Sequence, residues 1–263
     1  SSHEAATAAF ETSIGRKLAV DMHYTGWTSA FPTSDETADA RVGRLPLVSW
    51  NCGDTNANVT AGKDDAAIDA FAAGIEGFGK PVMLRWLWEM NLRDGTRPQC
   101  YDSSYDPPNG FDAAHFVAAW QHIHARFVAD GVTNVIWVWC PGASAMSIAA
   151  TFYPGSKYVD WVGADTYDRT NAGAAATIDA AYPYLTQYGK PAVIAENGEH
   201  AAVDGGNQPL YFSQLDGVLR ARPVIGAYLY FDSNVRPGDD WLLDPAGVSA
   251  FAAFAKGPYE SLP

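Results

Sequence analysis

Residues 82–91 read Val-Met-Leu-Arg-Trp-Leu-Trp-Glu-Met-Asn, and residues 192–198 read Ala-Val-Ile-Ala-Glu-Asn-Gly. Each stretch follows Gly-Lys-Pro, and each is a short apolar run that leads to a glutamate. Runs of this length are typical of strands that are buried on both faces of a parallel sheet. A glutamate at the end of such a strand is costly unless it has a partner or a task. The two stretches therefore predict a parallel sheet whose strand ends carry a functional site.

The same alternation of short apolar runs and amphipathic stretches fills the rest of the chain. Asp112, Asp244 and either Asp64 or Asp65 precede helical stretches as candidate N-caps. Helical spacing of apolar side chains is found at residues 4–14, 66–78, 112–129, 177–188, 212–219 and 248–254. Seven strands are expected, at residues 18–22, 47–50, 82–87, 135–139, 159–164, 192–195 and 225–230.

Strands that alternate with helices predict an α/β fold, a TIM-type (β/α)8 barrel, with residues 1–263 forming a single domain. A closed barrel of this type has eight strands. Seven are predicted here, and the chain begins with a helical stretch. The first strand is therefore either missing from this sequence or hidden in a segment that the pattern does not reveal.

The composition narrows the class of partner. The net charge is −13, which argues against nucleic acid and against anionic membranes as partners. No apolar run reaches the roughly 18 residues that suggest a transmembrane helix. Aromatic residues make up 13% of the chain, and although most should pack in the core, a surplus often lines carbohydrate sites. A neutral polysaccharide fits this composition, and we expect a monomer.

The three cysteines carry a prediction about location. Cys52 and Cys100 lie in polar loops after two consecutive predicted strands, and we expect them to form a disulfide. Such a bond would indicate a secreted protein whose signal peptide has been removed. Cys140 ends a predicted strand and is expected to be a buried thiol. The cysteines and histidines lack metal-ligand spacing, so neither a metal nor a cofactor is expected.

Polar and aromatic residues follow nearly every predicted strand. The carboxyl ends of parallel strands in a barrel meet at one face, where active sites form. His23 could reach a sugar hydroxyl, and each tryptophan near this face either lines a sugar subsite or packs in the core. The candidate substrate-binding residues are His23, Trp27, Trp50, Arg85, Trp88, Asn91, Trp139, Tyr167 and Trp241.

Two carboxylates at strand ends point to glycoside hydrolysis. One carboxylic acid protonates the leaving oxygen, and in the retaining mechanism the other attacks the anomeric carbon. Glu89 lies between Trp88 and Met90, apolar neighbours that should help it to keep its proton near neutral pH. Glu196 is expected to stay ionised and to act as the nucleophile.

Two further residues are expected to support this chemistry. Arg85 lies four residues before Glu89, so both side chains should face the same side of a strand, where a cation could keep the nucleophile ionised. Tyr167 could donate a hydrogen bond to the same carboxylate. The competing interpretation is a buried Arg85–Glu89 ion pair with Glu196 as a capped loop residue. That interpretation leaves two glutamates at strand ends unexplained.

At these residues the chain resembles glycoside hydrolase family 26. The similar segments are residues 85–91, 134–141, 158–167 and 191–198, and residues 47–50 and 241–244 also fit. The resemblance implies a retaining (β/α)8 barrel with Glu89 as acid/base, Glu196 as nucleophile and Tyr167 in contact with the nucleophile. The family's glutamates lie on its fourth and seventh strands. Here they lie on the third and sixth, as a missing first strand would produce.

One position departs from the family pattern. The family's mannanases typically have histidine immediately before the acid/base, where this chain has Trp88, and Leu92 follows Asn91 in place of their glycine. The resemblance implies a retaining, endo-acting enzyme on a neutral β-linked polysaccharide, most simply a β-1,4-mannan. The departure keeps β-1,3/1,4-glucan and β-1,3-xylan open as substrates. The same residues are also compatible with a transglycosylase and with a non-catalytic carbohydrate-binding barrel.

Overall fold

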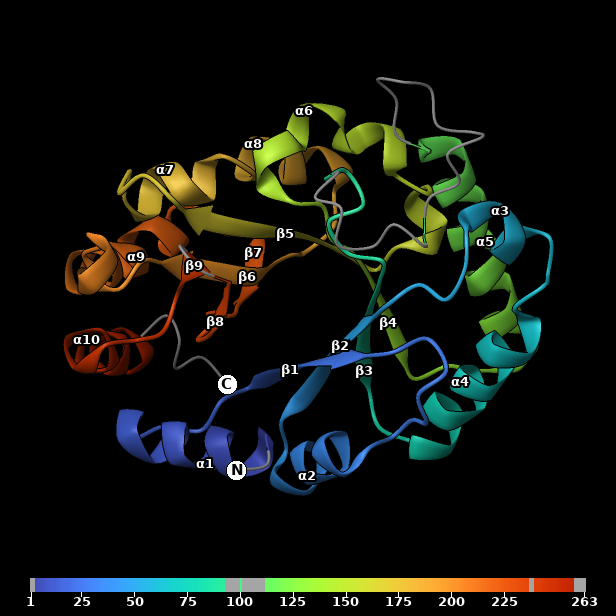
Figure 1. Cartoon of the computed structure of the whole chain (residues 1–263), viewed down its shortest axis with the longest axis horizontal. Coiled ribbons are helices and arrows are strands. Elements are labelled where there is room, and N and C mark those ends of the chain that lie inside the picture. Colours follow the sequence, from blue (N-terminus) through green and yellow to red (C-terminus); the bar gives the residue numbers. More distant parts are fainter. Residues whose placement is uncertain (1–2, 93–99, 101–111, 237–238, 258–263) are drawn as a thin grey trace. The chain divides into compact units, whose positions relative to one another are not determined.

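The computed structural model describes residues 3–92, 100, 112–236 and 239–257. The chain falls into two compact units, which are described separately here. Unit 1 comprises residues 1–19 and 164–263, and unit 2 comprises residues 20–163. One seven-stranded sheet has the strand order β1 to β7 in sequence order, with helices between successive strands (Figure 1). This is the topology of a (β/α)8 barrel with seven strands present among the described residues.

Unit 2 contains four complete strands and the start of a fifth. Its strands pair in parallel, and the register places Leu84 of β3 opposite Val48 of β2 and Trp137 of β4. Short helical turns occupy residues 143–158. The main elements are β1 Val20–Thr25, α2 Ser34–Val42, β2 Leu45–Trp50, α3 Asn56–Thr60, α4 Asp65–Phe78, β3 Val82–Trp86, α5 Ala113–Ala129, β4 Val135–Trp139 and β5 Trp161–Asp168.

One face of the unit 2 sheet is an aromatic core against α4 and α5. Trp50 and Trp86 are opposite each other in the β2–β3 register. Trp50 stacks on Phe71 of α4 at 4.3 Å between ring centroids, and Trp86 stacks on Phe116 of α5 at 5.4 Å. Because side chains alternate along a strand, Ser49 and Arg85 point to the opposite face.

Unit 1 holds the second half of the strand series. β6 and β7 pair in parallel, and α1, α10 and α9 pack successively against one another (Figure 1). Phe251 of α10 contacts both Phe10 of α1 and Phe212 of α9, with centroids 5.4 and 5.2 Å away. The elements are α1 His3–Ile14, the end of β5, α7 Ala174–Asp179, α8 Tyr182–Leu185, β6 Ala192–Glu199, α9 Gln208–Arg220, β7 Ile225–Tyr228, β8 Asn234–Arg236, β9 Asp239–Asp240 and α10 Pro245–Ala255.

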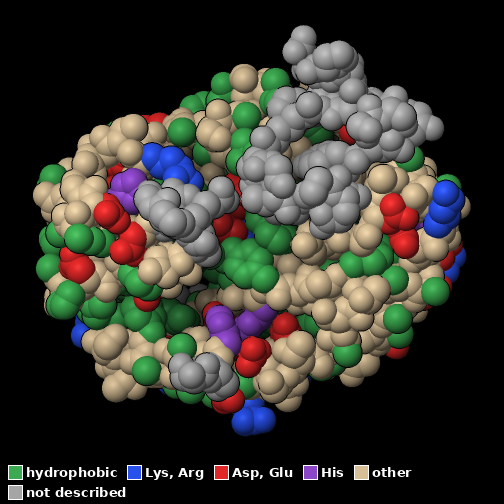
Figure 2. Space-filling model, in the orientation of Figure 1, with side chains coloured by type: hydrophobic (Ala, Val, Ile, Leu, Met, Phe, Trp, Pro, Cys, Tyr) green, Lys and Arg blue, Asp and Glu red, His purple; other side chains and the backbone are tan. Residues whose placement is uncertain are grey.

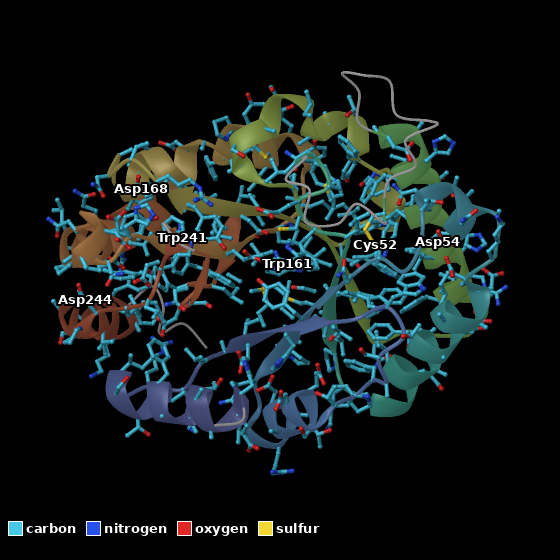
Figure 3. The ribbon with its side chains drawn as sticks, in the orientation of Figure 1. Cys52, Asp54, Trp161, Asp168, Trp241 and Asp244 are labelled. Carbon is cyan, nitrogen blue, oxygen red and sulfur yellow. A yellow bond between two sulfur atoms is a disulfide. The ribbon has the colours of Figure 1, made fainter. Side chains whose placement is uncertain are left out.

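The strand and helix positions largely agree with the sequence expectations, and the differences have local causes. The predicted helix 177–188 is wrong as a single element, because Pro183 lacks an N–H and divides α7 from α8. Asp112 and Asp244 cap their helices by accepting from the N–H groups of His115 and Gly247 (Asp244, Figure 3). Asp64 occupies the cap position of α4 without making that hydrogen bond.

The surface agrees with the acidic composition. Basic side chains on the face shown in Figure 2 are few and scattered among acidic ones, and they form no large patch there. Among the described residues, no helix combines the length and the apolar character needed to cross a bilayer.

Candidate active site

The turn that follows β3 holds Glu89 on a strained backbone. Leu87 and Glu89 have positive φ angles of 44° and 55°, a region that residues with a side chain rarely adopt. The turn is fixed because the N–H of Glu89 donates to the carbonyl of Cys140 at 2.8 Å and that of Leu92 donates to the carbonyl of Glu89 at 2.9 Å. Such strain persists only where the surroundings impose it, and it is concentrated at functional sites.

Asn91 joins this turn to the segment after β4. Its side chain is fully buried and pairs reciprocally with Gly142, since the N–H of Gly142 donates to Oδ1 and Nδ2 donates to the carbonyl, both at 2.8 Å. Nδ2 also donates to the carbonyl of Ala145 at 3.0 Å. Its polar atoms thus bind backbone, which gives Asn91 a structural role, and its contact with substrate stays a prediction.

Gly142 is required for space. A β-carbon at this position would meet the side chain of Leu92 and would lie 3.2 Å from Oε1 of Glu89. The φ of Gly142 is −79°, which any residue can adopt, so close approach alone explains the glycine. The segments after β3 and β4 thus approach each other closely beside the Glu89 carboxyl group.

Arg85 lies beneath this turn rather than on a surface. It is fully buried, and its Nε donates to Oγ of Ser49 at 2.7 Å. Its Nη1 lies 3.6 Å from Sγ of Cys140, and its Nη2 lies 2.9 Å from Sδ of Met22. The guanidinium is therefore held by neighbours in the core of unit 2, and its contact with substrate stays a prediction.

His23 is also held in a buried polar cluster. Its Nε2 lies 2.5 Å from Oδ2 of Asp39, and Oδ1 of Asp39 accepts from Nε of Arg44 at 2.7 Å. All three side chains are buried. Nε2 of His23 therefore links β1 to α2 through Asp39. The contact between His23 and a sugar hydroxyl stays a prediction.

Three of the candidate tryptophans lie in the core of unit 2. Trp50 and Trp139 are fully buried, and their indole N–H groups donate to the carbonyls of Trp27 and Phe152 at 3.3 and 3.0 Å. Trp27 stacks on Trp50 with centroids 4.3 Å apart and is itself buried. The burial of Trp50 and Trp139 favours the core-packing alternative for both, and their contact with a sugar stays a prediction.

Cys52 and Cys100 form a disulfide with a Cα–Cα distance of 5.7 Å (Cys52, Figure 3). The bond ties the segment after β2 to residue 100, in the segment between β3 and α5. Cys140 is a buried cysteine outside this disulfide, and its Sγ lies 3.6 Å from Nη1 of Arg85.

In unit 1, Glu196 is held by a neighbouring strand. Its side chain is only 5% exposed, and the hydroxyl of Tyr167 on β5 donates to its Oε2. Glu196 lies inside β6, which continues to Glu199, rather than at a strand tip as the sequence predicts. A hydrogen bond to a carboxylate favours its ionised form. The expected hydrogen bond from Tyr167 to Glu196 is therefore present, and the role of Glu196 as nucleophile stays a prediction.

An aromatic wall lies beside this carboxylate. Trp241 is 1% exposed and stacks on His200 at 4.3 Å, and the guanidinium of Arg169 lies 5.1 Å from its ring (Trp241, Figure 3). A β-carbon on Gly198 would lie 2.8 Å from both Trp241 and Tyr167, so this glycine lets both rings approach β6. The buried indole packs against Tyr167, with ring centroids 4.8 Å apart, and its contact with substrate stays a prediction.

The residue after Glu196 anchors β6 to its neighbours. Asn197 is fully buried, and its Nδ2 donates to Oγ1 of Thr166 at 2.9 Å and to the hydroxyl of Tyr211 at 2.8 Å. Its Oδ1 accepts from the hydroxyl of Tyr228 at 2.6 Å. Burial raises the pKa of both tyrosines, so both hydroxyls stay protonated, with that of Tyr228 donating to Asn197 and that of Tyr211 accepting from it. This network fixes the backbone that carries Glu196.

A buried pair of carboxyl groups lies at the end of β5 and β6. Burial raises the pKa of Glu199 to about 7, and the carboxylate of Asp168 adds to the effect (Asp168, Figure 3). Burial alone would also raise the pKa of Asp168, but N–H groups of residues 170, 172 and 173 donate to it and lower it. Oε1 of Glu199 accepts from the N–H of Asn207 at 2.9 Å, and Oε2 is buried beside Asp168 without a hydrogen bond of ordinary geometry, as a protonated carboxyl group next to a carboxylate can be.

Sequence reasoning missed Asn197, Glu199 and Gly142. The first two extend the polar end of an apolar run, where the pattern predicts a loop. The sequence did hold one signal that the strand continues. Asn197 and Glu199 occupy alternate positions along residues 196–199, and alternate positions of a strand share a face.

Comparison with known proteins identifies the family. The sequence profile of glycosyl hydrolase family 26 matches residues 69–212, more than half of the chain. The chain belongs to glycosyl hydrolase family 26. Both glutamates and Tyr167 lie within the matched residues, which also include β3 to β6.

The relatives of this chain carry the names of different activities. The chain is 28% identical over 95% of its length to Endoglucanase H of Acetivibrio thermocellus, and 32% identical over 49% to a mannan endo-1,4-beta-mannosidase of Bacillus subtilis. It spans 28% and 33% of these proteins, a third or less of their length. The structure of a Cellulomonas fimi endo-beta-1,4-mannanase double mutant has the same fold, with a TM-score of 0.70, 20% identity, and coverage of 95% of this chain and 66% of that one.

Proposed function

We propose that this family 26 hydrolase cleaves internal bonds of a neutral β-linked polysaccharide with retention of the anomeric configuration. The first candidate substrate is β-1,4-mannan. The observation that carries the proposal is the buried Glu196 carboxylate with the Tyr167 hydroxyl as its donor. A buried carboxylate that is fixed by a hydrogen bond from a tyrosine hydroxyl is suited to attack an anomeric carbon.

The reaction would take two steps. Glu89 donates its proton to the glycosidic oxygen while Glu196 attacks the anomeric carbon, so the glycosidic bond breaks and a covalent glycosyl ester forms. The Glu89 carboxylate then takes a proton from water, whose oxygen attacks the same carbon and releases Glu196. Two inversions give net retention. An experimental structure of the active enzyme should then place the two carboxyl groups roughly 5–5.5 Å apart.

The test separates the two roles. Glu89→Ala and Glu196→Ala should each lose nearly all activity on polysaccharide while keeping the wild-type circular dichroism spectrum. Added azide should restore turnover of an activated aryl glycoside in both variants. The glycosyl azide should have the β configuration with Glu89→Ala and the α configuration with Glu196→Ala. Glu76→Ala, on the exposed face of α4, is the matched control and should keep wild-type activity. Full activity in either active-site variant would refute the assignment.

A β-1,3/1,4-glucan is the second candidate substrate. Trp88 stands where the family's mannanases typically have histidine, and the relative that matches 95% of the chain is named an endoglucanase. Initial rates on mannan, mixed-linkage glucan and β-1,3-xylan, with product sizes from chromatography, decide between these substrates and between endo and exo action. Binding to any of them without released sugar would favour a carbohydrate-binding protein instead.

The disulfide supports a location outside the cytosol, because such bonds persist in oxidising compartments. We propose secretion on this basis. Detection of the protein in culture medium, with Cys52 and Cys100 oxidised by mass spectrometry, tests it.

A further inference from the structure

An exposed aromatic side chain accompanies Trp88 on unit 2. Tyr24, near the end of β1, is 49% exposed, the largest exposed fraction of any described aromatic residue. Its ring centroid lies 5.2 Å from that of Trp88, and the rings are tilted by 58°. Trp88 is half-buried and immediately precedes Glu89. The two rings therefore form one aromatic surface beside the carboxyl group proposed as the acid/base.

The strand register explains why Tyr24 lies there. Tyr24 is opposite Ser49 in the β1–β2 pairing, and Ser49 is opposite Arg85 in the β2–β3 pairing. Residues at matched positions of parallel strands share a face, so the three side chains form a row across the sheet. Tyr24 is the exposed end of this row, and Arg85 is its buried end.

The buried cation holds both rings in place. The guanidinium carbon of Arg85 lies 5.9 Å from the Tyr24 ring centroid and 5.2 Å from that of Trp88. Both distances are within the range of a cation–π attraction, which strengthens when the cation is shielded from water. Because Nε is already bound to Ser49, the guanidinium cannot turn away from the rings without losing that bond. The aromatic surface is therefore ordered before any ligand arrives, which lowers the entropy cost of binding.

A fixed, exposed pair of aromatic rings matches the chemistry of a sugar. A pyranose unit presents a face of C–H bonds, which packs on an aromatic ring, while its hydroxyl groups point outward to water. We propose that Tyr24 and Trp88 form a stacking platform for the sugar unit next to the bond that Glu89 protonates, and that Tyr24 determines how tightly this unit binds. This inference rests on the proposed function.

Kinetics of three Tyr24 variants test the platform. Tyr24→Ala and Tyr24→Leu should each raise KM for the preferred polysaccharide about tenfold, in line with the energy of one aromatic contact, and should change kcat less than threefold. Leucine keeps apolar packing against Trp88 but lacks a flat face, so it controls for a collapse of the site. Tyr24→Phe should keep the wild-type KM, because the ring face rather than the hydroxyl binds sugar. Tyr184→Ala, another partly exposed tyrosine on α8, should leave both constants unchanged.

A binding measurement separates this inference from the proposed function. In the Glu196→Ala background, affinity electrophoresis in gels containing the polysaccharide should show weaker retardation for Tyr24→Ala and Tyr24→Leu than for Tyr24→Phe. This readout does not depend on catalysis, so it tests Tyr24 even if no hydrolysis occurs. A KM and a retardation within twofold of the unmutated Tyr24 protein in both Ala and Leu variants would overturn the platform. An equal loss in Tyr24→Phe would also overturn it, since the hydroxyl would then carry the contact.

Discussion

Replacing Glu199 by glutamine should remove a loss of stability that the wild-type protein undergoes between about pH 4.5 and pH 7. The Glu199 side chain is 2% exposed, and burial raises its pKa from 4.5 to about 7 in the folded protein. Between these two values the folded protein keeps this proton while the unfolded chain has lost it. The folded state therefore binds more protons, and its stability falls as the pH rises through this window.

The size of the effect follows from the two pKa values. Each tenfold difference in proton affinity corresponds to about 1.4 kcal/mol, so the shift of Glu199 to about 7 corresponds to roughly 3 kcal/mol lost above pH 7. Glutamine keeps an oxygen for the N–H of Asn207 and an N–H that can donate to Asp168, but it does not titrate. The variant should match the wild type near pH 4.5 and be more stable by up to about 3 kcal/mol at pH 8.

Urea unfolding followed by circular dichroism at pH 4.5, 6, 7 and 8 measures this difference. Asp168 has a lowered pKa and stays ionised over this range, so its own titration does not interfere. Glu76→Gln, a change on the exposed surface of α4, should shift stability by the same small amount at every pH. A difference between Glu199→Gln and wild type that does not change with pH would refute the reasoning, because the proton would then not reside on this pair.

Two further substitutions test the supports of the proposed catalytic groups. Asn91→Ala should lower the free energy of unfolding by about 1–3 kcal/mol, since it leaves the buried N–H of Gly142 without an acceptor. It should also lower kcat more than KM. An unchanged melting temperature would contradict a stabilising role of the Asn91–Gly142 hydrogen bonds. Tyr167→Phe should lower kcat on the order of 10²-fold while leaving KM and thermal stability near wild type, because it removes only the donor to Glu196. A KM effect alone would instead make Tyr167 a substrate contact.

The strand series could be predicted because each buried parallel strand is marked by its own residues, as a short apolar run between turns. The run at residues 135–139 coincides with β4, and the start of β6 at Ala192 follows from Pro191 before it. The two glutamates could be selected by the same reasoning, since a charged residue directly after such a run conflicts with burial. These inferences need no knowledge of what lies elsewhere in the chain.

Features that depend on distant partners could not be predicted in this way. β6 continues through polar residues because Asn197 and Glu199 meet partners from β5, β7 and α9, which the local pattern does not contain. Trp50 ends its strand, as expected, but its place on the helix-facing side of the sheet buries it against α4. Helix α2 is polar and was missed, although the capping box of Thr33 and Glu36 marks its start.

The close packing at Gly142 has a consequence for how this sequence can change over time. The space that a side chain at position 142 would need is occupied by Leu92 and by the carboxylate of Glu89. If Glu89 has the acid/base role proposed above, its carboxyl group cannot be replaced, and only the side chain at position 92 can become smaller. We therefore expect the two positions to change together, with a larger residue accepted at 142 only where a smaller one is present at 92. Libraries that vary both together should recover active enzymes that single substitutions at position 142 would miss.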